Sequence, residues 1–205
     1  MSEELEAHHV FDRSFLARPS PDVAPQLLGA RLIGRGVTIR ITEVEAYLGA
    51  EDPGSHGHRG KTARNAVMFG PPGHLYTYFT YGMHTCANIV TGTEGTSSGV
   101  LLRAGEVIDG LETARSRRHS SKTDADLARG PGRLTVALGI MLSDGGQDLE
   151  TGDIRLEFSQ GPVEYQSGPR TGVSGPGGTD AFPWRFWIPN DPTVSPYRRS
   201  VPRKA

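Results

Sequence analysis

Residues 39–49 read Ile39-Arg40-Ile41-Thr42-Glu43-Val44-Glu45-Ala46-Tyr47-Leu48-Gly49, and this stretch decides the fold. Apolar and polar side chains alternate from Val37 to Thr42, which is the period of a half-buried strand. If the strand continues, the same alternation carries both glutamates and Tyr47 onto its core-facing side. Burying unpaired carboxylates is costly, so such a strand would need a functional reason. The alternative is that the strand ends near Ile41 and both glutamates are solvated, and the pattern alone does not decide between the two.

Length and composition predict one globular domain, residues 1–205, with many turns. Hydrophobic residues make up 36% of the chain and charged residues 22%, while 27 glycines and 15 prolines argue against a long helical bundle. Residues 1–12 are expected to be flexible, and residues 189–205 are expected to form a basic tail.

The sequence also predicts a cytoplasmic protein without membrane contact. No apolar run approaches the roughly 20 residues that span a bilayer. The N-terminus shows no basic region followed by an apolar one, which a secretory signal would need. A single cysteine, Cys86, excludes an internal disulfide and fits a reducing compartment.

The net charge of −1 gives no argument for nucleic acid binding, but the distribution of charge does. Residues 1–52 contain nine acids and five Lys or Arg, whereas residues 53–93 contain no acid. That second stretch holds four histidines together with Arg59, Lys61 and Arg64. A basic, aromatic surface beside an acidic lobe is typical of a groove for a polyanion. The alternative is a Gly- and Pro-rich loop that lacks acids by chance.

Periodicity and turn signals predict an α+β fold. Strands are expected over 31–42 with a hairpin turn at 34–36, over 74–81 and 84–90 as a second hairpin, and over 99–104, 154–158 and 184–188. Helices are expected over 20–28 with Ser20 as N-cap, over 106–118, and over 133–138 closed by Gly139. The prediction is a single α+β domain with a curved, largely antiparallel β-sheet, flanking helices and a protruding β-hairpin.

Three features of the chain converge on one candidate site. They are the carboxylates of residues 43–45, the polar loop 50–73 with His56, and the hairpin that ends in Tyr81. A loop longer than about 12–15 residues in a compact domain is usually functional or disordered. A large aromatic at a hairpin tip has little to pack against, so Tyr81 is a candidate wedge for a base stack. The alternative is that Tyr81 folds back onto its own hairpin.

Metal and cofactor chemistry lack support in the sequence. His56 and His58 stand in no recognised ligand spacing, and no phosphate-binding glycine motif follows a strand, so neither a metal nor a cofactor is expected. Cys86 is interpreted as a small core residue rather than a nucleophile. No lysine lies in the carboxylate or hairpin stretches to form a Schiff base, which argues against lyase activity.

Several segments occur together, in this order, in one known family: Glu43-Val44-Glu45-Ala46-Tyr47-Leu48-Gly49, Arg64-Asn65, Met68-Phe69, Leu75-Tyr76-Thr77-Tyr78-Phe79-Thr80-Tyr81-Gly82-Met83, Asn88, Leu101-Leu102-Arg103-Ala104 and Gly130-Pro131-Gly132-Arg133-Leu134. They resemble the alkyladenine (3-methyladenine) DNA glycosylases, the family that includes the mammalian enzyme and is distinct from the helix-hairpin-helix glycosylases. The resemblance covers about residues 15–187 and points to a bacterial member. Residues 57–62 are one residue shorter than the mammalian pattern, a Gly-Arg pair at 132–133 replaces Ser-Lys, and residues 174–182 align poorly.

The resemblance implies roles for individual residues. Glu45 would be the general base that activates water, and Arg103 would orient that water or bind the DNA backbone beside it. The flipped base would be bound by Tyr47 and His56, by Tyr78 on the opposite side, and by Asn88 at the pocket floor, where it disfavours the exocyclic amine of guanine. Tyr81 and Met83 would enter the duplex, and the DNA backbone would be bound by Arg59, Lys61, Arg64 and Arg133.

The implied function is a DNA glycosylase of base excision repair that acts on damaged purines in double-stranded DNA. It would flip out 3-methyladenine, 7-methylguanine, hypoxanthine or ethenoadenine and hydrolyse the N-glycosidic bond. The protein would be a nucleoid-associated monomer. Two alternatives stay open at this point: a non-catalytic nucleic-acid-binding module on the same fold, and a hydrolase of free nucleosides.

Overall fold

The computed structural model describes residues 11–80 and 82–200. Within these residues the chain forms an eight-stranded sheet in which every paired strand is antiparallel. The main path runs in the order β3 (Leu75–Thr80), β4 (His84–Val90), β5 (Gly99–Asp109), β2 (Val37–Tyr47), β1 (Arg31–Gly34) and β6 (Ile154–Glu157). Two short strands, β7 (Gln166–Gly168) and β8 (Arg185–Trp187), extend the sheet beside β2. The predicted α+β class is therefore confirmed.

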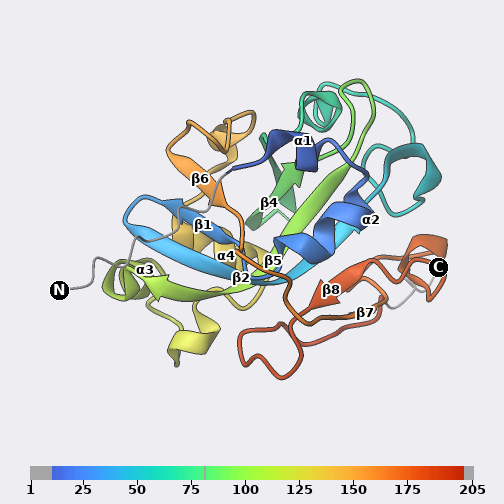
Figure 1. The fold of residues 1–205 in the computed structure, drawn as a ribbon. Coiled ribbons are helices and arrows are strands. Elements are labelled where there is room, and N and C mark those ends of the chain that lie inside the picture. The colour runs from blue at the N-terminus through green and yellow to red at the C-terminus, as the bar shows by residue number, and fades with distance from the viewer. Residues whose placement is uncertain (1–10, 81, 201–205) are drawn as a thin grey trace.

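The centre of the sheet is the pair β2 and β5, each 11 residues long, which runs through the middle of the molecule (Figure 1). One edge of β2 pairs with β5 over most of its length. The other edge pairs first with β1, over residues 37–40, and then with β8, over residues 43–45. The second half of β2 is thus enclosed on both edges, which is why the strand continues through both glutamates.

The pairing of β2 with β5 shifts register on either side of Glu43, as at a β-bulge. Before the shift, odd-numbered Ile39 and Ile41 lie in the hydrophobic core, whereas after it even-numbered Val44 and Ala46 do. A bulge inserts one residue and so exchanges the faces of all residues that follow it. Of the two alternatives, the structure shows the continued strand with both glutamates buried, but their placement on the core-facing side is wrong.

Hydrogen bonds locate the face that the glutamates occupy instead. Thr42 and Glu43 both bond to one C-terminal stretch, the first through Thr193 and the second through the backbone N–H of Ser195. Two consecutive side chains therefore point to the same side, opposite the core. Glu45 and Tyr47 follow on that side by ordinary strand alternation.

In the described part of the chain, four short α-helices flank the sheet: α1 (Arg13–Leu16), α2 (Ser20–Val23), α3 (Leu111–Arg117) and α4 (Pro131–Leu138). α4 packs against β4 and β5 and ends at Gly139 in the left-handed region (φ 84°), as predicted. Ser20 is the first helical residue rather than the N-cap, and its hydroxyl donates to the Tyr47 carbonyl. Pro25 falls where α2 changes into a 3₁₀ turn, Ala24–Leu27, so the predicted helix over 20–28 is only half α-helical.

The predicted helix over 106–118 begins with a strand and is helical only in its second part. Residues 106–109 complete β5, and the helix begins only after Gly110, whose φ of 72° marks the break. Both predicted hairpins are confirmed, and the tight turn of the first uses Arg35 (φ 51°) and Gly36 (φ 75°). No helix among the described residues is long and apolar enough to cross a membrane.

Candidate active site

A cavity of about 340 Å³ opens on the non-core face of the second half of β2. Its walls come from strands β2 to β5, from the long loop 50–73, from the start of α4 and from residues 171–174. In Figure 1 the long loop (cyan to teal) and the segment around β7 and β8 (orange to red) lie at the same end of the molecule. The lining includes all six predicted catalytic and base-binding residues: Glu45, Tyr47, His56, Tyr78, Asn88 and Arg103.

Glu45 is fully buried in the protein and held by two donors. The Tyr47 hydroxyl donates to Oε2 at 2.8 Å, and the Thr171 backbone N–H donates to Oε1 at 2.7 Å. Arg103 Nη1 lies 3.4 Å from Oε1, an ion pair rather than a hydrogen bond. An ionised carboxylate accepts about four hydrogen bonds, so the geometry leaves acceptor capacity that faces the cavity.

Tyr47 is both a wall of the cavity and a partner of Glu45. Burial, and then the neighbouring Glu45 carboxylate, raise the pKa of the Tyr47 phenol well above its ordinary value. The hydroxyl therefore stays protonated and donates to the carboxylate. Behind the ring, the Arg170 guanidinium lies 4.5 Å from its centroid, a cation–π contact that fixes the plane of the wall.

A cluster of aromatic rings forms another wall. The ring centroid of His56 lies 4.6 Å from that of Tyr78, edge to face, and the Tyr76 hydroxyl is 3.3 Å from His56 Nδ1. Burial, and then the charge of Arg64, lower the pKa of His56. The neutral imidazole is therefore the dominant form at neutral pH. Tyr76 was not among the predicted site residues, although strand alternation places it on the same side as Tyr78.

The floor of the cavity comes from β4, where Cys86 and Asn88 face the cavity and Ala87 and Ile89 face the core. Asn88 is buried, and its side-chain amide donates to the Tyr76 carbonyl at 3.4 Å. Cys86 is buried, as predicted for a small core residue, and it also lines the cavity. Burial raises the pKa of the Cys86 thiol, so this side chain lines the cavity as a neutral thiol and not as a thiolate.

Two functional neighbours were missed by sequence reasoning: Arg170 and Asp52. Arg170 is completely buried and forms a two-pronged ion pair with Asp52, with N–O distances of 2.5 and 2.6 Å. It also donates to the backbone carbonyls of Ala46 and Gly177. The pair joins the two loops that border the cavity. No local pattern marks it, since its members are 118 residues apart.

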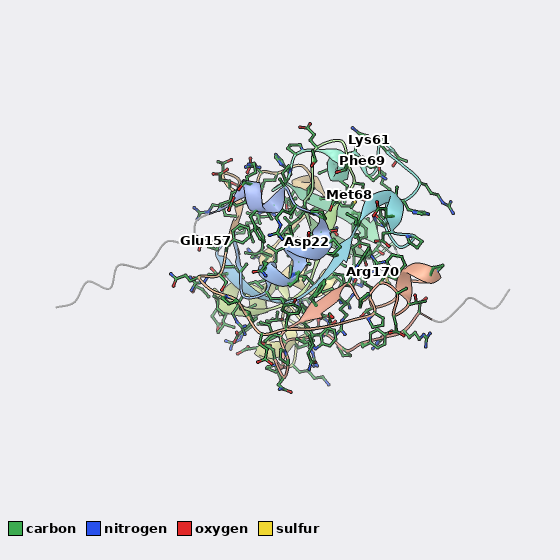
Figure 2. All side chains as sticks on the ribbon, turned by 45° about the vertical axis from the view of Figure 1, so that its right-hand side comes forward. Asp22, Lys61, Met68, Phe69, Glu157 and Arg170 are labelled. Atoms are coloured by element: carbon green, nitrogen blue, oxygen red, sulfur yellow. The ribbon has the colours of Figure 1, made fainter. Side chains whose placement is uncertain are left out.

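The predicted DNA contacts belong to segments that border the cavity, but none of those that the structure describes lines it. Tyr81 lies outside the described residues. Met83 is 69% exposed at the tip of the β3–β4 hairpin. Arg59 and Lys61 are exposed on the long loop, and Lys61 is labelled in Figure 2.

Other basic side chains have protein partners. Arg64 donates to the Phe79 carbonyl at 3.0 Å, and Arg133 pairs with Asp126. Asn65 holds the loop in shape, because its amide donates to the carbonyls of His56 and Gly60. Among the described residues no group of three or more His, Cys, Asp or Glu is placed to bind a metal ion.

A buried carboxylate beside an aromatic-walled cavity has the chemistry to hydrolyse a bond to a flat, stackable group. Residues 14–192 match the family model of the methylpurine-DNA glycosylases (MPG). The chain therefore belongs to this family and is a DNA glycosylase, a hydrolase of DNA repair.

Bacterial relatives agree with this assignment over almost the whole chain. A protein of Streptomyces avermitilis is 56% identical over 202 residues, which cover 94% of this chain and 93% of the relative. A protein of Leifsonia xyli is 54% identical over 195 residues, 91% of each chain, and one of Corynebacterium glutamicum is 51% identical over 187 residues, 91% of this chain and 97% of the relative. Each bears the name "Putative 3-methyladenine DNA glycosylase".

Proposed function

We propose that this DNA glycosylase excises alkylated or deaminated purines from double-stranded DNA, with Glu45 as the base that activates water. The substrate class is 3-methyladenine, 7-methylguanine, hypoxanthine and ethenoadenine. The observation that carries the proposal is the position of Glu45: a fully buried carboxylate, oriented by Tyr47 and Thr171, on the wall of an aromatic cavity.

The cavity suits a purine that has left the base stack. Its volume of about 340 Å³ lies in the range of small-ligand sites, about 300–1,000 Å³. Stacking on an aromatic wall contributes about 1–3 kcal/mol per base, and offsets part of the cost of flipping the nucleotide. A purine alkylated at N3 or N7 is cationic, so rings such as Tyr47 and Tyr78 favour it by cation–π attraction. A neutral His56 adds no opposing charge.

The chemical step needs one carboxylate. The water oxygen attacks C1′, the C1′–N bond breaks and its electron pair leaves with the base, while Glu45 accepts a proton from the water. A cationic alkylated purine departs as a neutral molecule without further protonation, whereas a neutral purine such as hypoxanthine also needs a proton. Among the described residues that line the cavity none is a lysine, which supports hydrolysis without lyase activity.

The remaining roles concern selection and DNA contact. Asn88 at the cavity floor would disfavour the exocyclic amine of normal guanine. Met83, together with Tyr81, would enter the duplex and occupy the gap that the flipped base leaves. The backbone contacts would come from Arg59, Lys61, Arg64 and Arg133, and the enzyme would act as a monomer.

The test is base release from duplexes that each carry one damaged purine. Wild-type protein should leave abasic sites in duplexes with 3-methyladenine, hypoxanthine or ethenoadenine, and Glu45→Gln should bind the same duplexes without cleaving the glycosidic bond. The matched control is Glu157→Gln on edge strand β6, far from Lys61 and the long loop in the view of Figure 2. Release of none of these bases by wild-type protein, or full activity of Glu45→Gln, would contradict the proposal.

A further inference from the structure

A second buried carboxylate lies directly behind the site. Glu43 does not line the cavity, yet it is fully buried, like Glu45. Arg103 is 8% exposed and Arg185 is 5% exposed, so two acids and two bases form one closed cluster. Buried charges are stable only when they are paired and hydrogen-bonded. The two negative and two positive charges of the cluster balance, but the two glutamates do not share the hydrogen-bond donors equally.

Glu43 takes most of the donors in this cluster. Its Oε1 accepts from Arg103 Nε at 2.9 Å and from Arg185 Nε at 2.6 Å, and its Oε2 accepts from the Ser195 backbone N–H at 2.7 Å. Arg103 Nη2 donates to the Ser195 hydroxyl at 3.0 Å. Two of the three guanidinium nitrogens of Arg103 are thus committed away from Glu45.

The third nitrogen, Nη1, is the one that faces Glu45, at 3.4 Å. An arginine prefers to present two parallel N–H groups to a carboxylate, and such a pair occupies both carboxylate oxygens. If Arg103 turned its fork onto Glu45, the acceptor positions that a water molecule needs would be filled by N–H donors. The bonds from Glu43 and Ser195 prevent that rotation.

We propose that Glu43 is a positioning residue that acts through Arg103. By holding Nε, it keeps the guanidinium beside Glu45 as a source of positive charge and prevents it from closing on the carboxylate. The inference rests on the proposed role of Glu45 as the base. It goes further by assigning a function to the acid that precedes it by two residues.

The test is a double-variant cycle on the single-turnover rate of base release. Glu43→Gln keeps the shape of the side chain and removes its charge, which weakens the bond from Arg103 Nε and leaves Glu45 as the only carboxylate that attracts Arg103. We expect the rate to fall by about tenfold to 100-fold, the effect of misplacing a catalytic group by about 1 Å. The dissociation constant for damaged duplex should be unchanged. In an Arg103→Met background the same substitution should have no further effect, because its effect passes through Arg103.

Arg185→Met is the matched control. It removes the other donor to the same Oε1 atom of Glu43 but leaves the Glu43–Arg103 contact, and Arg185 does not line the cavity. We expect this variant to lower the thermal midpoint while the rate stays near that of wild type. A rate loss equal to that of Glu43→Gln would assign Glu43 a purely structural role and overturn the proposal.

A second variant tests the positioning role of Glu43 independently. Ser195→Ala removes the second anchor of Arg103 and retains the backbone N–H bond to Glu43, so it tests the same idea if Glu43→Gln does not fold. It should lower the rate in wild type and not in the Arg103→Met background. Wild-type rates for Glu43→Gln, or additive losses in the double variant, would overturn the positioning role. Full activity of Glu45→Gln would instead overturn the proposed function itself.

Discussion

At the scale of single residues, the bond between Tyr47 and Glu45 is open to a direct test. Tyr47→Phe keeps the ring that forms the cavity wall and removes the hydroxyl that donates to Oε2. A hydrogen bond to a charged group contributes about 1.5–3 kcal/mol, so the single-turnover rate should fall by roughly 10- to 100-fold. Binding of damaged duplex should persist. Tyr165→Phe, an exposed tyrosine outside the cavity lining, is the control, and an unchanged rate for Tyr47→Phe would show that the bond is dispensable.

We predict that His56 makes base release depend on pH. Its pKa lies below the ordinary value of 6.5, first because of burial and then because of Arg64. As pH falls through that lowered pKa, the imidazole gains a positive charge beside Tyr76 and Tyr78, where a cationic base would bind. Release of 7-methylguanine by wild type, divided by release by His56→Gln, should therefore decline below pH 6.5 and stay flat above it. His119→Gln is the control, and a flat ratio down to pH 5 would exclude this role.

The same shift has a consequence for stability, with a definite sign. Between the lowered pKa in the folded state and 6.5 in the unfolded state, the unfolded chain binds the proton first. The free energy of unfolding therefore decreases as pH falls below 6.5, and His56→Gln removes that part of the decrease.

At the scale of elements, the ion pair between Arg170 and Asp52 joins the C-terminal segment to the long loop. Both side chains are fully buried. Removing one member leaves a buried charge without its partner, which costs about 3–5 kcal/mol. Arg170→Met should therefore lower the free energy of unfolding in urea by this amount. It should also slow base release, because Arg170 precedes the Thr171 N–H that donates to Glu45.

The control for this prediction is Arg115→Met on α3. Arg115 pairs with two acids, Glu112 and Asp124, but on the exposed surface, where ion pairs contribute little to stability. Its urea midpoint should match that of wild type. If both variants lost the same free energy of unfolding, burial would not be the reason why the Arg170–Asp52 pair stabilises the protein.

The elements also show which parts of the site were predictable from the sequence. Local patterns predicted the β3–β4 hairpin and the first half of β2, because they depend on neighbouring residues, but they did not decide whether β2 continues to Glu45. The bulge at Glu43 has no local signature: it depends on register with β5 and β8, and it changed the face on which both glutamates lie. Glu106 was predicted to start a helix but belongs to strand β5 for a similar reason. Its pairing with Arg40 on β2 outweighs the pattern of early acids and late arginines that favoured a helix.

The long-range contacts of the site could not be predicted from the sequence. Arg170 lies in a stretch for which the sequence predicted neither a helix nor a strand, and its partner Asp52 lies in the long loop 50–73. Ser195, which fixes Glu43, belongs to the segment predicted as a basic tail. Each of these residues matters through a partner more than 100 residues away, so the tertiary fold alone reveals it.

At the scale of the whole molecule, charge is separated in a way that the net value of −1 conceals. The acid-free stretch 53–93 contributes both the long loop and the β3–β4 hairpin, and both supply residues to the cavity. The acids of the N-terminal half that lie on β2 are buried in ion pairs, so they add little negative potential at the surface. The exposed charges of residues 53–93 are therefore basic ones, among them Arg59 and Lys61.

This arrangement predicts a specific salt dependence of DNA binding. Each phosphate neutralised on duplex DNA contributes about −0.9 to the slope of log K against log salt concentration. Arg59 and Lys61 are exposed on the long loop, so replacing both by Gln should reduce the magnitude of the slope by about 1.8. The change should be the same for undamaged and damaged duplexes, because backbone contacts carry no base information. Arg155→Gln, on the edge strand β6, is the control and should leave the slope unchanged, since β6 is separated from the cavity by β1. If the double variant has the wild-type slope, the DNA backbone contacts another part of the surface. If the double variant also loses base release while its slope is unchanged, the two side chains act in the site and not in the approach of DNA.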